Sequence, residues 1–256
     1  MPSKEMSECL SAVMPAYNEE DTLLAVSRRV LALPCLHELI IVDDCSRDNT
    51  GKIAEELARF DPRVKVVHLE TNRGKSEALK TGFALTTGAI VVVQDADLEY
   101  DPAEIPDVIA PILNGEADVV YGSRFLVRKE ARVLYFYHYL ANKALTFLSN
   151  LFTNVNMTDV ATGCKAFRGD IIRNMILTSS GFGFEFEVTA KAAKLGCAIY
   201  EAPISYRGRT YEEGKKITWK DGVAAFWYIL KFNLFCSLER SYRVLPKTRK
   251  QRSYPV

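Results

Sequence analysis

Hydrophobic residues in the first half of the chain fall into short runs that are rich in Val and Ile. These runs do not alternate with polar residues, which is typical of strands buried on both faces of a sheet. They lie at Leu10–Met14, Glu38–Asp43, Val64–Leu69, Ala89–Gln94 and Asp118–Tyr121. The segments between them have the hydrophobic spacing of helices and lie at Glu19–Leu33, Thr50–Phe60, Lys75–Leu85 and Ala103–Leu113. This alternation predicts an α/β fold with a mainly parallel, Rossmann-like sheet flanked by helices, and ligands at the carboxyl ends of the strands.

The second half of the chain has a different pattern. It predicts a long aromatic helix at Arg132–Phe152, a helix at Phe184–Leu195 and an apolar, amphipathic helix at Ile217–Leu238. Extended segments are expected at Cys164–Arg168 and Ala198–Tyr206. We therefore expect one domain over residues 1–238, followed by a basic tail over 239–256 that is mobile.

Composition places the chain among ordinary globular proteins, with 256 residues, 48% hydrophobic and 25% charged. The formal net charge is +1, so no overall field favours nucleic acid as a partner. The six Cys form no C-x-x-C pair or Cys/His cluster, which disfavours a zinc site or a disulfide framework. Reduced thiols and an N-terminus without a signal-like apolar stretch make the cytoplasm the expected compartment.

Acidic residues follow three of the predicted strands. Glu19 follows the first strand, Asp44 follows the second, and Asp95, Asp97 and Glu99 follow the fourth. Carboxylates that meet at one edge of a sheet repel each other unless a cation lies between them, and oxygen ligands favour Mg²⁺ or Mn²⁺. The alternative is that these acids only cap the helices that follow. Other phosphate or nucleophile motifs are missing from the sequence: it has no G-x-x-x-x-G-K-[ST], no G-x-G-x-x-G after the first strand and no G-x-S-x-G.

Four sequence motifs resemble family 2 glycosyltransferases with the GT-A fold: Pro15-Ala16-Tyr17-Asn18-Glu19-Glu20, Val42-Asp43-Asp44, Asn72-Arg73-Gly74-Lys75 and Asp95-Ala96-Asp97. A narrower resemblance is to the dolichyl-phosphate mannose synthase branch, which glycosylates polyprenyl phosphates. It rests on Gly122-Ser123-Arg124, on Asp159 to Lys165, and on Arg209-Thr210-Tyr211 with Lys215. The resemblance covers roughly residues 9–235 of the chain.

The resemblance implies roles for individual residues. Residues 1–125 would form the half that binds the nucleotide sugar, and residues 126–238 the acceptor half. The residues expected to hold the donor nucleotide are Pro15, Ala16, Tyr17, Glu19, Val42, Asp44, Lys75, Asp95 and Ala96. Those expected to hold Mg²⁺ or Mn²⁺ are Asp95, Asp97 and Glu99. Those expected to act in catalysis are Arg124, Asp159, Arg209 and Lys215, the last two from a loop that closes over the site.

The chemistry of the acceptor leaves two roles open for Asp159. A hydroxyl acceptor needs a general base, whereas a phosphate is already anionic and needs cations such as Arg124, Arg209 and Lys215. Asp159 is thus either a base or an anchor that orients Arg124 or Lys165, and we favour the anchor. The alternative for the segment from Arg207 to Lys216 is a solvated surface loop.

A polar stripe runs along the oily helix at Arg132–Phe152. His138, Asn142, Thr146 and Ser149 or Asn150 recur at three- or four-residue steps. The resemblance places a phosphate-binding cation and a hydroxyl residue four apart here, and His138 and Asn142 occupy the matching positions. With Ser123 and Arg124, they are expected to bind the acceptor. The alternative is a buried His in a helix interface. Glu185 and Glu187 open the next helix, either to compensate its N-terminal charge or to act near the sugar or Lys165.

The C-terminal part of the chain bears on location. No apolar stretch is long enough to cross a membrane, but the last predicted helix carries Trp219, Phe226, Trp227, Tyr228 and Phe232. The tail has six Lys or Arg against one Glu, which favours an anionic membrane surface; the alternative is a solubilising tail. We expect a peripheral protein on the cytoplasmic face.

We therefore expect an inverting glycosyltransferase that moves a hexose to a polyprenyl or dolichyl phosphate, with GDP-mannose as the leading donor and UDP-glucose as the next. Two alternatives remain: an enzyme of the same fold with a sugar-hydroxyl acceptor, and a non-catalytic subunit that binds a partner or lipid. A sugar-nucleotide pyrophosphorylase is less favoured, because the sequence has no Gly-rich N-terminal nucleotide loop.

Overall fold

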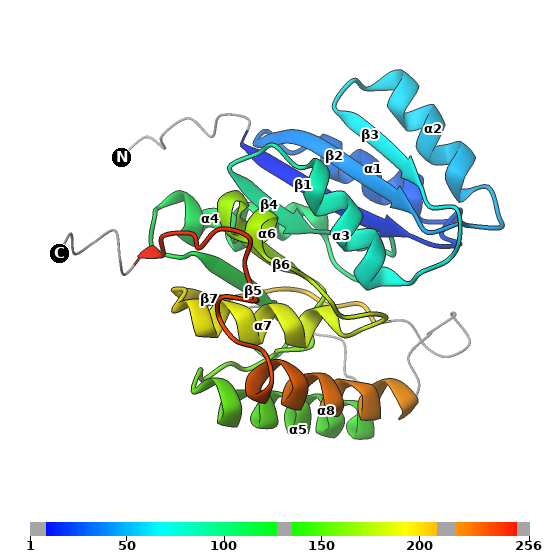
Figure 1. The fold of residues 1–256 in the computed structure, drawn as a ribbon. Helices are drawn as coiled ribbons and strands as arrows, with labels where there is room; N and C mark the ends of the chain where they lie inside the picture. Colours follow the sequence, from blue (N-terminus) through cyan, green and yellow to red (C-terminus); the bar gives the residue numbers. More distant parts are fainter. Residues whose placement is uncertain (1–8, 127–134, 209–218, 250–256) are drawn as a thin grey trace.

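The computed structural model describes residues 9–126, 135–208 and 219–249. Within these residues the chain forms one seven-stranded sheet in the order β3-β2-β1-β4-β6-β5-β7 (Figure 1). The strands are β1 (Leu10–Ala16), β2 (Leu36–Asp43), β3 (Val64–His68), β4 (Ile90–Val93), β5 (Val119–Ser123), β6 (Lys165–Arg168) and β7 (Ile199–Pro203). All pairings are parallel except those of β6, which runs antiparallel between β4 and β5. The prediction of a mainly parallel α/β sheet is confirmed.

The helices match the hydrophobic pattern closely. They are α1 (Leu23–Leu31), α2 (Thr50–Phe60), α3 (Lys75–Leu85), α4 (Ile105–Leu113, after the 3₁₀ turn η1 at Pro102–Glu104), α5 (Phe136–Thr153), α6 (Gly169–Asn174), α7 (Phe184–Leu195) and α8 (Trp219–Leu234). The first helix begins at Leu23 and not at Glu19. Asn18 has a positive φ of 52°, and the amides of Asn18 and Glu19 donate to Ser46 and Thr50 in the loop before α2. The short α6 was not predicted, since six residues are too few to show a periodicity.

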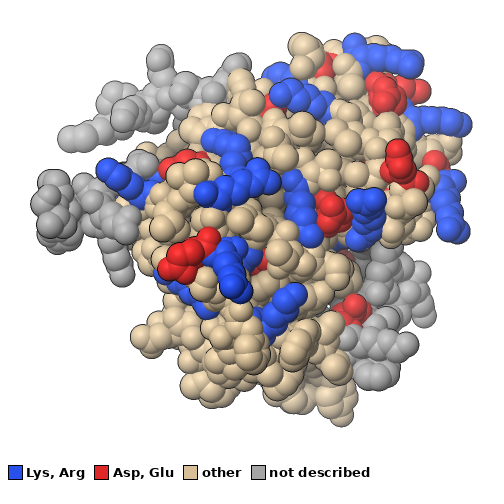
Figure 2. Space-filling model, in the orientation of Figure 1, with Lys and Arg blue, Asp and Glu red and all other residues tan. Residues whose placement is uncertain are grey.

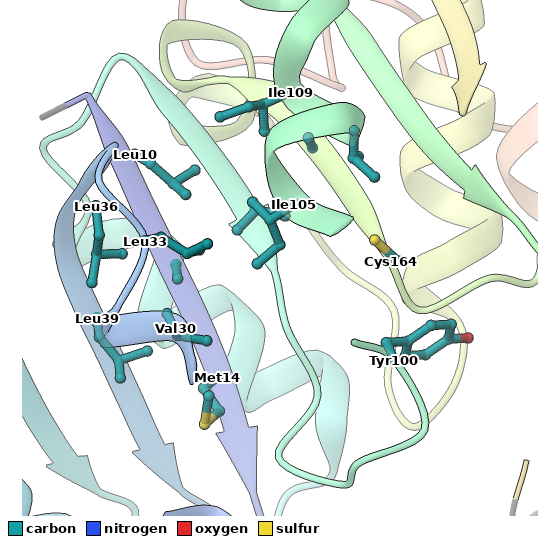
Figure 3. Packing of buried hydrophobic residues seen from close by; sticks show 14 of the residues in the cluster. Leu10, Met14, Val30, Leu33, Leu36, Leu39, Tyr100, Ile105, Ile109 and Cys164 are labelled. Atoms are coloured by element: carbon teal, nitrogen blue, oxygen red, sulfur yellow. The ribbon is translucent and has the colours of Figure 1, made fainter. Parts of the chain in front are cut away.

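Two hydrophobic layers enclose the sheet. Alternate β1 residues face opposite sides: Met14 packs with α1 and α4, whereas Val13 packs with α3 and α7. Figure 3 shows residues of the first of these layers, among them Leu10 and Met14 of β1, Val30 of α1, Leu39 of β2 and Ile105 of α4. Because both faces are covered, the strands are apolar throughout and carry no polar alternation.

Helices α5 and α8 form an outer layer against α7, on the side away from the sheet (Figure 1). The packing of α5 reverses the usual amphipathic order, whereas α8 buries the apolar Ala225, Ile229 and Phe232. In α5, the polar Thr146 and Ser149 are only 3% and 2% exposed, whereas Phe147 and Leu151 are 68% and 66% exposed. The surface over these two helices is almost free of charged residues at the lower end of Figure 2. None of the helices in the described ranges is long and apolar enough to span a membrane.

The tail packs against the domain as far as residue 249. Tyr242 pairs with Met175, and its hydroxyl donates to the carbonyl of Lys191 at 3.0 Å. Asp118 accepts the backbone N–H of Arg249 at 3.0 Å. The prediction of a mobile tail is therefore wrong for residues 239–249, because buried side chains and backbone hydrogen bonds fix them; residues 250–256 lie outside the described ranges.

Candidate active site

The loops that follow β1 and β2 are joined to each other. Pro15 and Ala16 end β1, and the Ala16 carbonyl accepts the N–H of Asp44 at 2.9 Å. Tyr17 is half-buried and Glu19 is buried, with the Glu19 N–H donated to Thr50 at the start of α2. The loops predicted to hold a nucleotide thus form one connected edge at the carboxyl ends of the strands.

Asp44 holds the turn that precedes α3 at this edge of the sheet. It is buried, and its two carboxylate oxygens accept the backbone N–H groups of Arg73 and Gly74, each at 2.7 Å. Gly74 has a φ of 83°, a conformation that favours glycine, and it ends the turn from which α3 begins. Asp44 therefore positions Lys75, the first residue of α3. Its predicted contact with the nucleoside, like that of Val42, stays a prediction.

Lys75, Asp95 and Glu185 form a cluster at the end of β4. The Lys75 ammonium lies 2.7 Å from Oδ1 of Asp95 and 3.6 Å from Oε1 of Glu185. Burial by itself would lower the pKa of Lys75, but the two carboxylates offset this effect and hold its pKa above the ordinary value. Lys75 thus stays protonated and fixes the first acid of the Asp95-Ala96-Asp97 motif.

The other two acids after β4 have different surroundings. Asp97 is half-buried like Asp95, whereas Oε2 of Glu99 accepts the Tyr206 hydroxyl at 2.9 Å. The Glu99 carbonyl also accepts the N–H of Arg207 at 3.0 Å, which ties this loop to the chain after β7. In the described ranges, no three His, Cys, Asp or Glu side chains are grouped as metal ligands. The metal role of Asp95, Asp97 and Glu99 stays a prediction.

Arg124 and Asp159 form a paired unit at the end of β5. Nε of Arg124 lies 2.6 Å from Oδ2 of Asp159, and Nη2 lies 2.8 Å from Oδ1. Asp159 is fully buried. The guanidinium also lies over the Tyr206 ring, 5.1 Å from its centroid. A carboxylate held on both oxygens in this way orients a cation and is poorly suited to accept a proton.

Glu201 supports this pair and was missed by the sequence reasoning. From β7, its carboxylate accepts the backbone N–H groups of Thr158 (2.9 Å) and Asp159 (3.1 Å). The Thr158 hydroxyl in turn lies 2.6 Å from that of Ser123, so the predicted acceptor residue Ser123 is part of the same network. The sequence signal that could have revealed Glu201 is an acidic residue within a short extended segment, two residues before Pro203.

Lys165 is fully buried behind the site. Its ammonium donates to the carbonyls of Val160 and Thr162 and lies 4.9 Å from the centroid of the Tyr121 ring. Burial lowers the pKa of Lys165 to about 8, although the charges of Glu185 and Asp159 act in the opposite direction. Lys165 thus fixes the loop that carries Asp159.

The predicted acceptor residues on α5 lie near its first turns. The Asn142 side-chain amide donates to the carbonyl of His138 at 2.9 Å, within the helix. Lys143, which the sequence reasoning missed, lies 4.2 Å from the Phe125 ring centroid and donates to the Thr158 carbonyl at 3.3 Å. It adds a cation beside Arg124. Arg209 and Lys215 lie outside the described residues.

Comparisons with known proteins agree with this arrangement. The sequence profile of "Glycosyl transferase family 2" matches residues 11–176. The chain is 32% identical over 210 residues to an undecaprenyl-phosphate mannosyltransferase of Micrococcus luteus, covering 79% of this chain and 85% of that protein. It is also 32% identical to a polyprenol monophosphomannose synthase of Mycolicibacterium smegmatis, covering 77% of each.

Solved structures give the same fold. Glucosyl-3-phosphoglycerate synthase from Mycobacterium tuberculosis, solved with Mn²⁺, uridine diphosphate and phosphoglyceric acid, superposes with a TM-score of 0.70 at 23% identity. The superposition covers 90% of this chain and 80% of that chain. The resemblance found in the motifs is therefore confirmed: the protein is a glycosyltransferase with the GT-A fold and belongs to glycosyl transferase family 2.

Proposed function

We propose that the enzyme transfers a hexose from a nucleotide sugar to the phosphate of a polyprenyl or dolichyl lipid. The observation that carries this proposal is the Arg124–Asp159 pair, with a separation of 2.6 Å between Nε and Oδ2. In this pair the Asp159 carboxylate holds the Arg124 guanidinium in place, and the guanidinium can bind an anionic acceptor. The relatives in Micrococcus and Mycolicibacterium are named for transfer to undecaprenyl phosphate and to a polyprenol, which supports the same acceptor class here.

The reaction needs no general base. An oxygen of the lipid phosphate attacks the anomeric carbon of the sugar, the bond from that carbon to the nucleoside diphosphate breaks, and the configuration inverts. The acceptor is already anionic near neutral pH, so no proton has to be removed. Arg124 and Lys143 orient the incoming phosphate, and Arg209 and Lys215 are proposed to add positive charge to the leaving diphosphate. The alternative, a hydroxyl acceptor with Asp159 as base, requires that carboxylate to leave its guanidinium partner.

The donor site is proposed to hold a divalent cation. Asp95 and Asp97 supply carboxylate oxygens, which suit Mg²⁺ or Mn²⁺, and both side chains are only partly buried. When bound, the cation would neutralise charge on the diphosphate. GDP-mannose is the preferred donor in this proposal, in line with the mannose named for the relatives, and UDP-glucose is second.

The enzyme is further proposed to work at the cytoplasmic face of a membrane. The exposed apolar face of α5 and α8 supports this location. It begins at Phe136, which is 67% exposed, in the helix that also carries His138 and Lys143 near the site. A lipid acceptor held at such a face would present its phosphate to Arg124 while its chain stays in the bilayer.

A donor panel tests the function directly. The purified enzyme is incubated with Mn²⁺ or Mg²⁺, a polyprenyl phosphate and radiolabelled GDP-mannose, UDP-glucose or UDP-N-acetylglucosamine. Label that passes into the organic phase with one donor is the expected result, with GDP-mannose giving the highest rate. Transfer to free sugars or glycosides, without labelled lipid from any donor, would contradict the proposal and favour a hydroxyl acceptor.

A further inference from the structure

Glu185 and Glu187 lie in the first turn of α7, but their carboxylates have opposite surroundings. Glu187 is saturated: it accepts the backbone N–H groups of Thr178 and Ser179, each at 2.8 Å, and pairs with Lys191 at 2.6 Å. Glu185 is only 5% exposed, yet its Oε2 atom has no hydrogen-bond partner in the part of the chain that the structure describes. A buried carboxylate oxygen in this state is costly, so its retention points to a ligand.

The position of Glu185 indicates which part of the enzyme it serves. Its other oxygen, Oε1, lies 3.6 Å from the Lys75 ammonium, which in turn binds Asp95 at 2.7 Å. Backbone packs tightly around this cluster, since a Cβ built on Gly163 would lie 2.5 Å from Oδ2 of Asp95 and 3.2 Å from Nζ of Lys75. Glu185 is therefore one side chain away from the first acid of the motif that faces the donor.

The charges of the cluster select the class of ligand. A phosphate next to the Glu185 carboxylate would be repelled by it. A divalent cation between Glu185 and Asp95 would have to displace Lys75, whose ammonium already lies between the two acids. A hydroxyl group is neutral, can donate to Oε2 and forms a strong hydrogen bond with a carboxylate. The donor hexose is the part of the substrate that carries several hydroxyl groups.

We propose that Glu185 binds a hydroxyl group of the donor hexose and thereby helps to select the sugar. This inference rests on the proposed function, because it requires a nucleotide-sugar donor. In this role Oε2 accepts the hydroxyl hydrogen, while Oε1 stays beside Lys75 and keeps the carboxylate in place. Glu187, with its oxygens occupied by the backbone and Lys191, holds the start of α7.

The test compares the binding of a nucleotide sugar with that of its bare nucleotide. Titration calorimetry with Mn²⁺ gives the dissociation constants of GDP-mannose and GDP, and of UDP-glucose and UDP, for the wild type, Glu185→Gln and Glu187→Gln. In Glu185→Gln, affinity for the preferred nucleotide sugar should fall about tenfold, because the hydrogen bond to a charged carboxylate becomes a weaker one to a neutral amide. Affinity for the bare nucleotide should stay unchanged. Glu187→Gln should lower the melting temperature but leave the ratio of the two affinities as in the wild type.

Deoxy and epimeric donors complete the test. The donor that lacks the contacted hydroxyl should bind the wild type and Glu185→Gln equally. The loss of affinity from removing the hydroxyl and the loss from Glu185→Gln are then not additive. If Glu185→Gln keeps the wild-type ratio and folds normally, the inference is wrong while the proposed function stands. If the wild type binds no nucleotide sugar at all, both are overturned. A loss of GDP and GDP-mannose binding by the same factor would contradict sugar recognition and indicate a role through Lys75 and Asp95.

Discussion

Arg124 binds both carboxylate oxygens of Asp159, and Asp159 is fully buried beneath it. This geometry favours Asp159 as an anchor for Arg124 over Asp159 as a general base. In Asp159→Asn the side chain keeps its shape but loses its charge, so the guanidinium is held less firmly and we expect kcat to fall by about 100-fold. The pH dependence of the remaining activity should keep the wild-type shape. A pH–rate profile that loses its acid limb only in the variant would instead identify Asp159 as the base.

Glu201 should affect turnover through the backbone of the loop that carries Asp159. Its carboxylate accepts the N–H groups of Thr158 and Asp159, so Glu201→Gln loosens the loop without removing the ion pair. We expect kcat to fall by about tenfold, less than in Asp159→Asn. Steady-state kinetics with saturating donor measures this. The double variant with Asp159→Asn should be little worse than Asp159→Asn alone, and full additivity would contradict a shared role.

Metal affinity should depend on Asp97 more than on Glu99. Glu99 accepts the Tyr206 hydroxyl at 2.9 Å, and loss of its charge leaves Asp95 and Asp97 in place. In Asp97→Asn, the Mn²⁺ concentration for half-maximal activity should rise by about tenfold or more, with a smaller shift in Glu99→Gln. A Mn²⁺ titration at saturating donor measures both variants. Equal shifts would favour the original sequence prediction, in which Glu99 is itself a ligand.

His68 makes stability depend on pH. Asp43 and Glu55 each lie 2.9 Å from one of its ring nitrogens and raise the pKa of His68 above its ordinary value. The stabilisation is therefore complete below the unfolded pKa of about 6.5 and is lost as pH rises through the folded pKa. His68→Gln should lower the melting temperature at about pH 5.5 and have a smaller effect at about pH 8.5. Because His68 is partly exposed, the effect should be modest, and an equal effect at both pH values would contradict it.

The pattern of hydrophobic and polar residues along the sequence was enough to predict the sheet, most helices and the acidic residues at the ends of the strands. Thr50–Phe60, Lys75–Leu85 and Phe184–Leu195 have the bounds that the periodicity predicts. What it could not show is the direction of β6, because four residues pair equally well either way and the decision depends on β4 and β5. The loop before the first helix was also misassigned, because its left-handed Asn18 and its contacts with the β2–α2 loop depend on the tertiary structure.

Within the candidate site, residues that belong to a local sequence motif were easier to predict than those brought in from a distant part of the chain. Lys75 and Asp95 were both expected at the donor edge, and the structure brings them to 2.7 Å. Glu201 lies 42 residues from Asp159 in sequence, and only strand pairing brings its carboxylate to that loop. The polar stripe of α5 was recognised, but the side it faces was not. Thr146 and Ser149 of the stripe are buried, whereas Phe147 is exposed. Periodicity shows that a helix has two faces and does not show which one is covered.

The packed tail should contribute to stability. The Tyr242 ring is buried and its hydroxyl donates to the Lys191 carbonyl. Tyr242→Ala should lower the free energy of unfolding by about 3 kcal/mol, and Tyr242→Phe by about 1 kcal/mol. Denaturant titration measures both. Lys247→Ala is the control, because its side chain is exposed and the substitution keeps the carbonyl that accepts from Arg168. A Tyr242→Ala variant as stable as the control would mean that the tail detaches in solution.

The apolar face of α5 and α8 should bind a membrane. Phe147 and Trp227 are 68% and 56% exposed, so Phe147→Asp and Trp227→Asp remove apolar contact with a bilayer without opening a cavity in the protein. Each variant should keep the wild-type melting temperature and lose about tenfold in binding to vesicles of anionic phospholipid, measured by co-sedimentation. Phe60→Asp is the matched control, because Phe60 is 88% exposed on α2, at the far end of the molecule (Figure 1). Unchanged binding in Phe147→Asp would contradict membrane docking, and conversion of a dimer to a monomer on gel filtration would show that a second copy covers this face.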